Sequence, residues 1–185
     1  MGVGKTTLLT RLKERVGMPC VIQDFKHNIC LDDFYAGKDC VFQKQMIFLF
    51  SNYHLLADAE ERYNIFVSDF CFERSFVMSR SVLKDRELML YEENYAYLKQ
   101  KLHFEKMVIF LHGDKNKIVD NIRRRGRVNE RNVTADYIDK CQRTMIEGLE
   151  YLNADQLLDI NVDDIDILSN RCMEFLLPQI RLYLL

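Results

Sequence analysis

The sequence predicts an α/β protein of three layers, in which a parallel β-sheet is covered by helices on both faces. Short segments that are apolar throughout, as strands of a covered parallel sheet are, alternate with longer segments whose apolar residues have helical spacing. The chain also has only seven glycines and two prolines, which argues against a turn-rich β-sandwich. Its 185 residues suit one domain spanning 1–185.

The first part of the chain contains two predicted helices and one strand. A helix over 6–16 is predicted by leucine and valine residues at helical spacing, and Gly17 ends it. A short buried strand follows at 20–22, and a turn or short helix at 28–35. The segment 40–59 is predicted to be a long helix, and because it is apolar on nearly all sides we expect it to be central.

The middle of the chain repeats the alternation of strand and helix. A second strand is expected at 64–68, followed by an amphipathic helix over 86–102. Five apolar residues in a row predict a third strand at 107–111. A helix over 114–124 should then end in a basic turn around Gly126.

The last part supplies one further strand between two helices. Thr134 is a suitable cap for a helix over 134–152, whose apolar residues form one stripe. A last strand is predicted at 157–160 and a last helix at 165–177.

Composition excludes several classes of protein. The 26 basic and 28 acidic residues leave a net charge of −2, which excludes a globally basic nucleic-acid wrapper, though not a local basic patch. No two of the six cysteines have C-x-x-C spacing, so they indicate reduced thiols. No apolar run approaches the roughly 20 residues of a membrane span, and no signal peptide is evident. We expect a cytosolic enzyme, with the nucleus or mitochondrial matrix as alternatives, and neither a membrane nor a nucleic acid as partner.

The chain opens with the second half of a phosphate-binding loop, whose full form is G-x-x-x-x-G-K-[ST]. Backbone N–H groups around Gly2 and Gly4, with those of the helix that follows, would form an anion cradle. Lys5 would reach the outer phosphates of a nucleotide, and the Thr6 hydroxyl would bind Mg²⁺. Thr7 completes the motif, although an ordinary helix start is the alternative.

Two parts of this motif would lie before Met1. The first loop glycine is one, and the apolar strand that normally feeds the loop is the other. We therefore expect that the true start of the chain precedes Met1. The alternative is a chain that begins within the loop and whose sheet lacks a central strand.

Four further segments decide which kind of enzyme this is. They are Leu31-Asp32-Asp33-Phe34-Tyr35, Asp69-Phe70-Cys71-Phe72-Glu73-Arg74-Ser75, Arg123-Arg124-Arg125-Gly126-Arg127-Val128-Asn129-Glu130 and Leu158-Asp159-Ile160-Asn161-Val162-Asp163. Taken in this order, they resemble the deoxynucleoside kinases, the family of deoxycytidine, deoxyguanosine, deoxyadenosine and insect multisubstrate kinases. The resemblance covers nearly the whole chain and implies the P-loop kinase fold, with a lid at about 123–131.

The resemblance gives roles to charged residues past the second strand and in the lid. Glu73 would support Mg²⁺, and Arg74 would hold the sugar 5′ oxygen and the phosphoryl group. Arg125 and Arg127 would place their guanidinium groups on the transferring phosphoryl group. A surface ion pair and a solvated charge run or RNA patch are the alternatives. One lid arginine of the family falls here at Asn121.

The acceptor side has matching positions for the sugar and the base. Tyr35 and Glu130 correspond to the family residues that clasp the deoxyribose 3′-hydroxyl. Gln45 lies on the apolar helix, where a buried amide needs partners and a nucleobase edge offers both a donor and an acceptor. A bond from Gln45 to the backbone is the alternative, and Gln43 is a competing candidate.

The family's general base is the hardest residue to place. A count back from Tyr35 without gaps puts Gln23 at the position of the catalytic glutamate, and glutamine does not accept a proton at neutral pH. Asp24 does so if the register slips by one residue, although neighbouring strand residues point opposite ways. We favour Asp24.

Two more positions concern the bases of donor and acceptor. Asn161 and Asp163 lie in a segment that resembles the loop around the donor base, although an ordinary turn is the alternative. Ser79 stands where relatives that prefer purines or deoxycytidine often carry aspartate facing the base. A small residue there would leave room for the thymine methyl group and favour pyrimidines.

Together these features predict an ATP-dependent deoxynucleoside kinase with Mg²⁺ as cofactor. ATP and a deoxynucleoside would give ADP and a deoxynucleoside monophosphate. The alternatives are a nucleoside monophosphate kinase of the thymidylate-kinase type, and a catalytically impaired relative with a binding role, which the half loop and Gln23 support. The resemblance also implies a homodimer.

Overall fold

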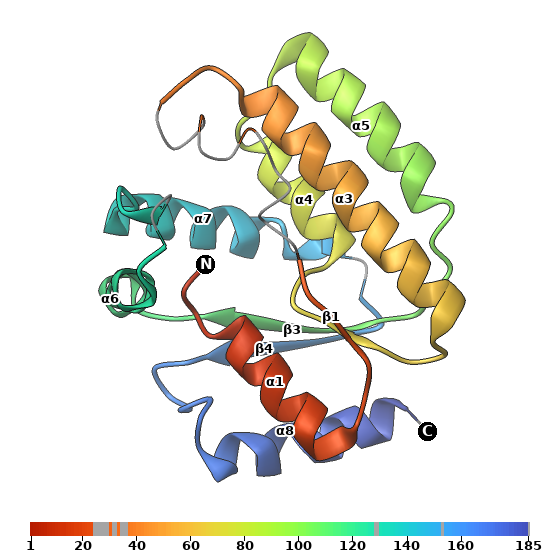
Figure 1. Cartoon of the computed structure of the whole chain (residues 1–185), viewed down its shortest axis with the longest axis vertical. Helices are drawn as coiled ribbons and strands as arrows, with labels where there is room; N and C mark the ends of the chain where they lie inside the picture. Colours follow the sequence, from red (N-terminus) through yellow and green to blue (C-terminus); the bar gives the residue numbers. More distant parts are fainter. Residues whose placement is uncertain (24–29, 31–32, 34–36, 128–129, 153, 185) are drawn as a thin grey trace.

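Two pairs of parallel strands form the middle layer of the fold in the computed structural model (Figure 1). The structure describes residues 1–23, 30, 33, 37–127, 130–152 and 154–184. Its four strands are β1 (Cys20–Val21), β2 (Val67–Ser68), β3 (Met107–His112) and β4 (Gln156–Asn161). β1 pairs with β2 and β3 pairs with β4, both in parallel. The parallel alternation predicted from the sequence is confirmed.

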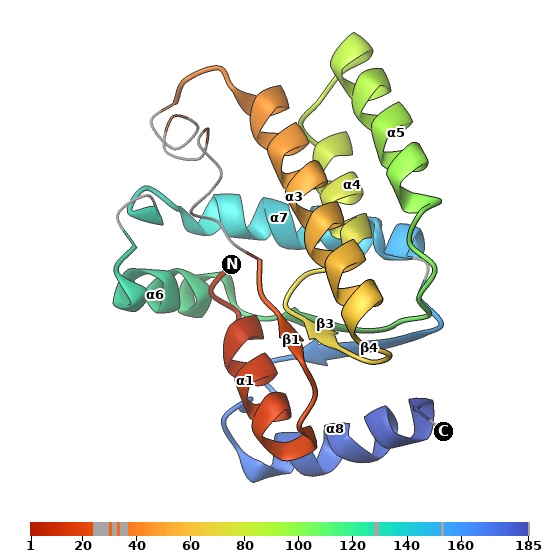
Figure 2. The same cartoon turned by 45° about the vertical axis from the view of Figure 1, so that its right-hand side comes forward.

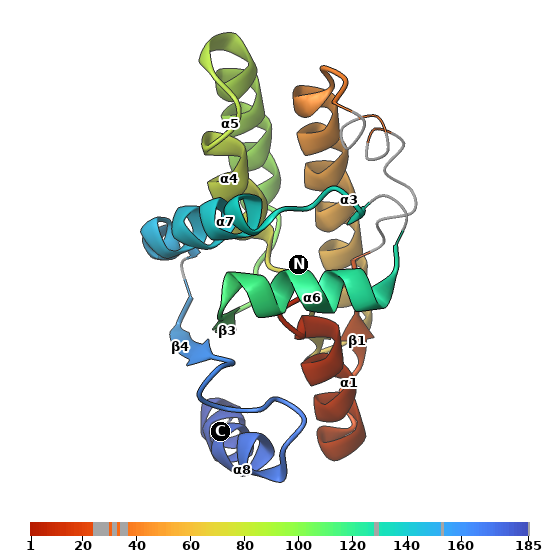
Figure 3. The same ribbon diagram turned by 90° about the vertical axis from the view of Figure 1, so that its left-hand side faces the viewer.

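Helices cover both faces of this layer (Figures 1 and 2). On one face lie α1 (Lys5–Val16) and α8 (Asn170–Tyr183). The other face carries α3 (Val41–Arg62), α4 (Phe72–Arg80), α5 (Asp85–Lys99) and α7 (Ala135–Glu147). α6 (Lys115–Arg125) follows β3 and packs against α7 (Figure 3). A 3₁₀ turn, Leu149–Leu152, leads from α7 toward β4.

The buried apolar residues divide between these faces. One cluster joins α1, α6 and α8 to β3 and β4, with Leu12 and Leu176 at 2% and 0% exposure. A second cluster lies between α3, α4 and α5 and includes the fully buried Leu49 and Tyr91.

The helices differ from their predicted bounds in three places. α4 was not predicted as a helix, because its sequence was interpreted only as a motif that follows a strand. The helix predicted over 134–152 ends at Glu147, and Gly148 separates it from the 3₁₀ turn. The last helix begins at Asn170 rather than at 165, because the Ser169 hydroxyl accepts a hydrogen bond from Cys172 N and caps it there.

The prediction that the long helix is apolar nearly all round is wrong for α3. Its buried side includes Lys44, Gln45 and Asn52, whereas Phe50 is 47% exposed. α3 therefore brings polar groups toward the interior, which matters for the acceptor side of the site.

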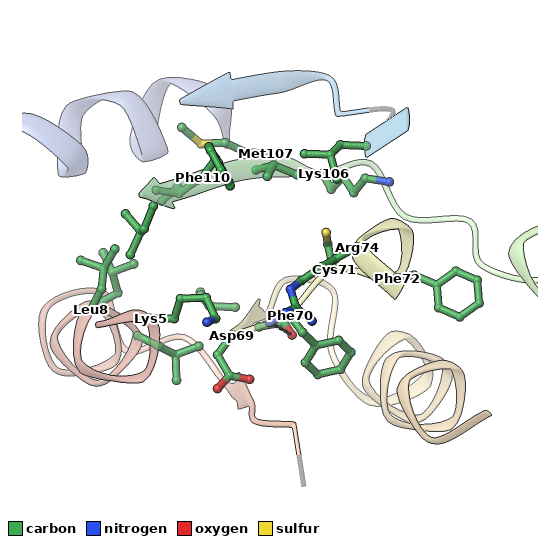
Figure 4. Close-up of a pocket in the computed structure, with 18 of the residues that line it drawn as sticks. Lys5, Leu8, Asp69, Phe70, Cys71, Phe72, Arg74, Lys106, Met107 and Phe110 are labelled. Carbon is green, nitrogen blue, oxygen red and sulfur yellow. Dashed lines mark hydrogen bonds between the residues drawn. The ribbon is translucent and has the colours of Figure 1, made fainter. Parts of the chain in front are cut away.

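An apolar cavity of about 370 Å³ separates β2 from β3 (Figure 4). Val67 of β2 and Ile109 of β3 lie on opposite sides of it, and Leu8 of α1 lines it as well. Within the described residues, neither β2 nor β3 pairs with a strand on the side that faces this cavity.

Two negative expectations concern the cysteines and the membrane. None of the six cysteines, all within the described residues, forms a disulfide. Among the helices that the structure describes, none has both the length and the apolar character needed to cross a bilayer.

Candidate active site

The phosphate loop is held in a conformation that requires glycine. Gly4 caps α1 with φ 95°, and Gly2 has φ 65°. A Cβ atom on Gly4 would lie 2.0 Å from Ile167 Cδ1, and one on Gly2 would lie 2.7 Å from the Ile118 carbonyl oxygen. The loop therefore fits tightly against its neighbours, and the first N–H groups of α1 have no side-chain cap. These groups are available to an anion, as the motif predicts.

Asp69 joins this loop to the strand layer. Thr6 Oγ1 donates a 3.1 Å hydrogen bond to Asp69 Oδ2, and Gln23 N donates one of 2.8 Å to Oδ1. Asp69 follows directly on β2 and is 9% exposed. Thr7, the next residue of the motif, is exposed on α1. A buried carboxylate thus lies beside the hydroxyl that the motif assigns to Mg²⁺.

Two cationic side chains, Lys5 and Arg74, lie near Asp69. The pKa of Lys5 is lowered to about 8, mainly by burial and further by the nearby charges of Arg74 and Arg125, while Asp69 raises it. Lys5, Asp69 and Arg74 line the same cavity (Figure 4). Within the described residues, the Arg74 guanidinium has no hydrogen bond or ion pair. One carboxylate beside two cations leaves a site that attracts an anion.

Gln23 has a structural role here rather than that of a base. Its side chain is buried and donates a 2.7 Å hydrogen bond to Asn52 Oδ1, and Asn52 Nδ2 donates one of 2.8 Å to Ser75 Oγ. This chain of bonds connects β1 to α3 and α4. Asp24, the predicted base, lies outside the described residues, as does Tyr35.

Glu73 differs from its predicted place. Its carboxylate is ion-paired with Lys106 and lies 3.8 Å from Lys99 Nζ. No described contact brings it to Thr6, whose acidic partner is Asp69. These contacts favour Asp69 over Glu73 for a metal role, and the metal role of either residue stays a proposal.

The lid arginines are held by Glu130. Arg125 Nη2 lies 2.5 Å from Glu130 Oε2, and Arg127 Nη1 lies 3.6 Å from Oε1. Glu130 is 7% exposed, so its carboxylate is engaged by both lid arginines. Asn121, which replaces a lid arginine of the family, donates a 3.1 Å hydrogen bond to the Gly2 carbonyl and connects α6 to the phosphate loop.

The acceptor side contains a buried amide that fits the predicted base contact. Gln45 is 6% exposed and has no hydrogen-bond partner within the described residues, whereas the competing candidate Gln43 is exposed. A buried amide normally has partners, so Gln45 is suited to a ligand. Lys44 beside it is also buried, and burial lowers its pKa to about 8.

Ser79 is enclosed within α4 and its hydroxyl is already bonded, which argues against the predicted contact with the base. It is fully buried, and its hydroxyl donates a 2.7 Å hydrogen bond to the Ser75 carbonyl within α4. Its environment is the interior between α4 and its neighbours, including Tyr91 on α5. The expected preference for pyrimidines, which depended on this contact, loses its structural basis.

The segment around Asn161 and Asp163 meets the start of α6. Asp163 Oδ2 accepts a hydrogen bond from Asp114 N, and its Oδ1 accepts one of 2.7 Å from Lys117 Nζ. Asn161 Oδ1 accepts a 3.0 Å bond from Asp163 N. Lys117 is the first cause of the lowered pKa of Asp163. The carboxylate of Asp163 is thus occupied by protein donors, and the side chains fix this loop beside β3.

Two residues of the site were not predicted from the sequence. Asp69 was quoted only as part of the motif that contains Glu73, although an acidic residue directly after an apolar strand is itself a signal for a phosphate site. Asn121 was noticed only as a departure from the family pattern. Its contact with Gly2 depends on how α6 packs, for which the sequence contains no local signal.

Comparison with known proteins agrees with this geometry. A family model described as deoxynucleoside kinase matches residues 1–180. The deoxyguanosine kinase of Bacillus subtilis (strain 168) is 26% identical over 145 residues, which cover 76% of this chain and 70% of that protein. The deoxyadenosine/deoxycytidine kinase of the same organism is 25% identical over 189 residues, covering 92% and 82%.

Solved structures show the same fold. A deoxyadenosine kinase from M. mycoides with the products dCMP and a flexible dCDP bound matches with a TM-score of 0.83 at 16% identity. The match covers 98% of this chain and 95% of that one. The same enzyme with bound dATP matches with a TM-score of 0.82. The α/β arrangement is therefore that of the P-loop kinases.

Proposed function

This chain belongs to the deoxynucleoside kinase family, and from that premise we propose which of its residues carry phosphoryl transfer from ATP to the 5′-hydroxyl of a deoxynucleoside. The observation that carries the proposal is the meeting of Lys5, Asp69 and Arg74 beside the phosphate loop. Phosphoryl transfer asks a protein mainly for positioning and for charge stabilisation, and this arrangement supplies both.

The donor phosphates would be held by the loop and its lysine. The N–H groups from Gly4 into α1 would bind phosphate oxygens, and Lys5 would lie over the outer phosphates. Lys5 is half-buried with Arg74 near it, so negative charge from ATP would relieve the repulsion between them. A bound nucleotide should therefore raise the pKa of Lys5 above its unliganded value.

Mg²⁺ fits the oxygen groups of Thr6 and Asp69. Magnesium is commonly bound through one or two protein oxygens, together with substrate phosphates and water. Thr6 Oγ1 and Asp69 supply such a pair, whereas within the described residues no group of three or more ligands is present. Bound there, the ion would neutralise charge that develops on the phosphates. Thr6 would give up its hydrogen bond to Asp69 or share it.

The acceptor would be bound by residues from α3 and the neighbouring loops. We propose that Gln45 pairs with the base edge, that Tyr35 and Glu130 clasp the 3′-hydroxyl, and that Asp24 removes the proton of the 5′-hydroxyl. The buried, unpartnered amide of Gln45 supports the first assignment. The Glu130 carboxylate is paired with Arg125 and Arg127. If Glu130 binds the 3′-hydroxyl, the nucleoside must either displace these arginines from the carboxylate or bind to it beside them.

The lid would complete the site over the transferring group. Arg125 is among the charges that lower the pKa of Lys5, which supports a place for it near the phosphate loop. We propose that Arg125 and Arg127 turn from Glu130 toward the phosphoryl group when ATP binds. Asn161 and Asp163 would border the donor base; the bonds from α6 to Asp163 support an ordered loop there.

The test uses two substitutions in the charge cluster. Lys5→Ala and Arg74→Ala should each lower kcat/KM by about 10²-fold or more, because each removes one electrostatic contact to the transition state. Lys13→Ala on the exposed side of α1 is the control. Full activity in both variants would refute these roles. The comparisons do not favour the nucleoside monophosphate kinase or the impaired relative, and activity of the parent toward deoxynucleosides separates all three.

The oligomer and the compartment are further proposals. We propose a homodimer formed through the long helices, and the exposed Phe50 of α3 and Met89 and Tyr97 of α5 support an apolar contact there. The mass in solution, measured by light scattering for the parent and for Phe50→Ser, tests it. The thiols, none of which is in a disulfide, support the reducing cytosol.

A further inference from the structure

The first turn of α4 carries two opposite charges, Glu73 and Arg74, which line two different cavities. Arg74 lines the cavity that it shares with Lys5 (Figure 4). Glu73, one residue earlier, is ion-paired with Lys106 and lines a second cavity of about 260 Å³. Arg74 does not line this second cavity, whereas Lys106 lines both. Successive helical residues are about 100° apart around the axis, which explains how one turn serves both sides.

The carboxylate of Glu73 is deeply buried beside Lys106. Its side chain is 4% exposed, one oxygen is bound to Lys106, and Oε2 is buried without a hydrogen-bond partner within the described residues. A buried carboxylate in such surroundings persists only if it is paired, because its desolvation is costly. The Lys106 ammonium, with Lys99 at 3.8 Å, supplies that pairing.

Lys106 is itself fixed to the sheet. Its backbone N donates a 2.7 Å hydrogen bond to Asp155 Oδ2, and its carbonyl accepts one of 3.0 Å from Asp155 N. Lys106 directly precedes β3, and Asp155 directly precedes β4. The Glu73–Lys106 pair therefore ties the start of α4 to the start of the β3–β4 pair.

We infer that Glu73 is a positioning residue, which acts through Lys106 to hold the first turn of α4 so that Arg74 faces the phosphate loop. The inference rests on the proposed function, because it assumes that Arg74 contacts the transferring phosphoryl group. In this inference Glu73 does not bind the metal and acts only through the position of Arg74. A displacement of about 1 Å in a group of this kind can lower a rate by about 10²-fold.

The test compares Glu73→Gln with Lys106→Gln in the full chain. Both variants should lower kcat by about tenfold or more, while KM for ATP and the half-saturating Mg²⁺ concentration change less than about threefold. Glu92→Gln, which removes a carboxylate from an exposed ion pair with Arg80, is the matched control and should keep the parental rate. The rise in Tm that MgATP gives should stay at the parental value in Glu73→Gln, which measures binding apart from turnover.

The decisive step is to repeat Glu73→Gln in an Arg74→Ala background. If Glu73 acts through Arg74, the second substitution should lower kcat by less than about twofold, because the group that it positions is gone. If the falls in kcat caused by Glu73→Gln and Arg74→Ala multiply in the double variant, the inference is overturned. A tenfold rise in the half-saturating Mg²⁺ concentration in Glu73→Gln, but not in Lys106→Gln, would also overturn it. If Glu73→Gln does not fold, the same cycle is read with Lys106→Gln. Parental activity of Arg74→Ala would instead refute the proposed function.

Discussion

The hydroxyl of Thr6 donates a 3.1 Å hydrogen bond to Asp69, although the two residues lie 63 positions apart in the chain. This bond joins the phosphate loop to the end of β2. The other Asp69 oxygen accepts from Gln23 N at the end of β1, so one carboxylate fixes three segments at the same edge of the strands. Ligands of α/β proteins bind at that edge.

Asp69→Asn should therefore reduce both nucleotide binding and turnover. The substitution keeps the shape and removes the charge, so the rise in Tm that MgATP gives should shrink while that given by ATP with EDTA changes little. The rate constant kcat should fall by about 10²-fold, as for loss of a charged contact to the transition state.

Asp58→Asn is the matched control for this substitution. Asp58 forms an exposed ion pair with Arg62 on α3, so its loss should leave both measurements unchanged. Equal responses to MgATP in Asp69→Asn and the parent would contradict the assignment of Asp69.

The pH dependence of ATP use should follow Lys5. Burial and two neighbouring guanidinium groups lower its pKa to about 8, so the free enzyme loses this positive charge as the pH rises through about 8. We expect kcat/KM for ATP to be highest below that pH and to fall above it. Arg74→Gln should move the fall to higher pH, because it removes a charge that lowers the pKa of Lys5.

Lys44 provides the necessary control for this profile, because burial lowers its pKa to the same value. In Lys44→Met the fall in kcat/KM above about pH 8 should persist. A profile that becomes flat in that variant would show that Lys44, not Lys5, titrates.

Gly4→Ala should destabilise the phosphate loop by more than the backbone strain of a positive φ alone, because the new Cβ would also meet a neighbouring side chain. Gly4 has φ 95° and its Cβ would collide with Ile167, whereas Gly17 has φ 73° with nothing within 4 Å of a Cβ. Gly17→Ala should therefore lower stability by only about 1 kcal/mol, from the left-handed conformation, and should leave the KM for ATP unchanged.

Gly4→Ala should lower Tm further than Gly17→Ala and raise the KM for ATP. The measurements are thermal unfolding and ATP saturation curves on both variants. If the two behave alike, the contact between Gly4 and Ile167 is unimportant.

The sequence predicted the fold well because its signals were local. The strand of five apolar residues at 107–111 and the Gly-Lys-Thr start of α1 each need only neighbouring residues to be recognised. α4 was not predicted, because its nine residues contain buried Glu73, Ser75 and Ser79 and show no simple apolar stripe. Their burial follows from contacts with α3, α5 and α7 that only the folded chain provides.

The site was predictable where a motif fixes both residue and direction. Lys5 and Thr6 are examples, since the loop and its helix decide where they point. Glu73 shows the limit, because the motif gave the residue but not the side of α4 on which it lies. Asp69 is the converse case, because its bonds to Thr6 and Gln23 depend on tertiary contacts and suggest for it the metal role that the motif gave to Glu73.

Asp24 is the predicted base, and Asp24→Asn should lower kcat by about 10²- to 10⁴-fold with little change in ATP binding. Gln23 cannot replace it, since its amide is bound to Asn52. Adding Gln23→Glu to Asp24→Asn should restore part of the rate, because the double variant has a carboxylate one residue away. An unchanged rate in Asp24→Asn would show that the base lies elsewhere.

Ser79→Asp should act on stability rather than on the choice of base. Ser79 is fully buried and its hydroxyl bonds within α4, so a carboxylate there would be buried without a described cation. Such a group costs several kcal/mol, and each kcal/mol lowers Tm by about 2–4 °C in a chain of this size.

We therefore expect Tm to fall by at least about 6 °C in Ser79→Asp. Ser79→Ala, which loses one hydrogen bond of about 1 kcal/mol, should lower Tm by only about 2–4 °C. Turnover should be measured below Tm on both variants and the parent, with thymidine, deoxycytidine, deoxyadenosine and deoxyguanosine. Any fall in turnover should be by the same factor for all four deoxynucleosides. A selective loss of thymidine use in a folded Ser79→Asp protein would show that residue 79 reaches the base. Only a carboxylate in the ligand site would distinguish thymidine, with its 5-methyl group, from the other three deoxynucleosides.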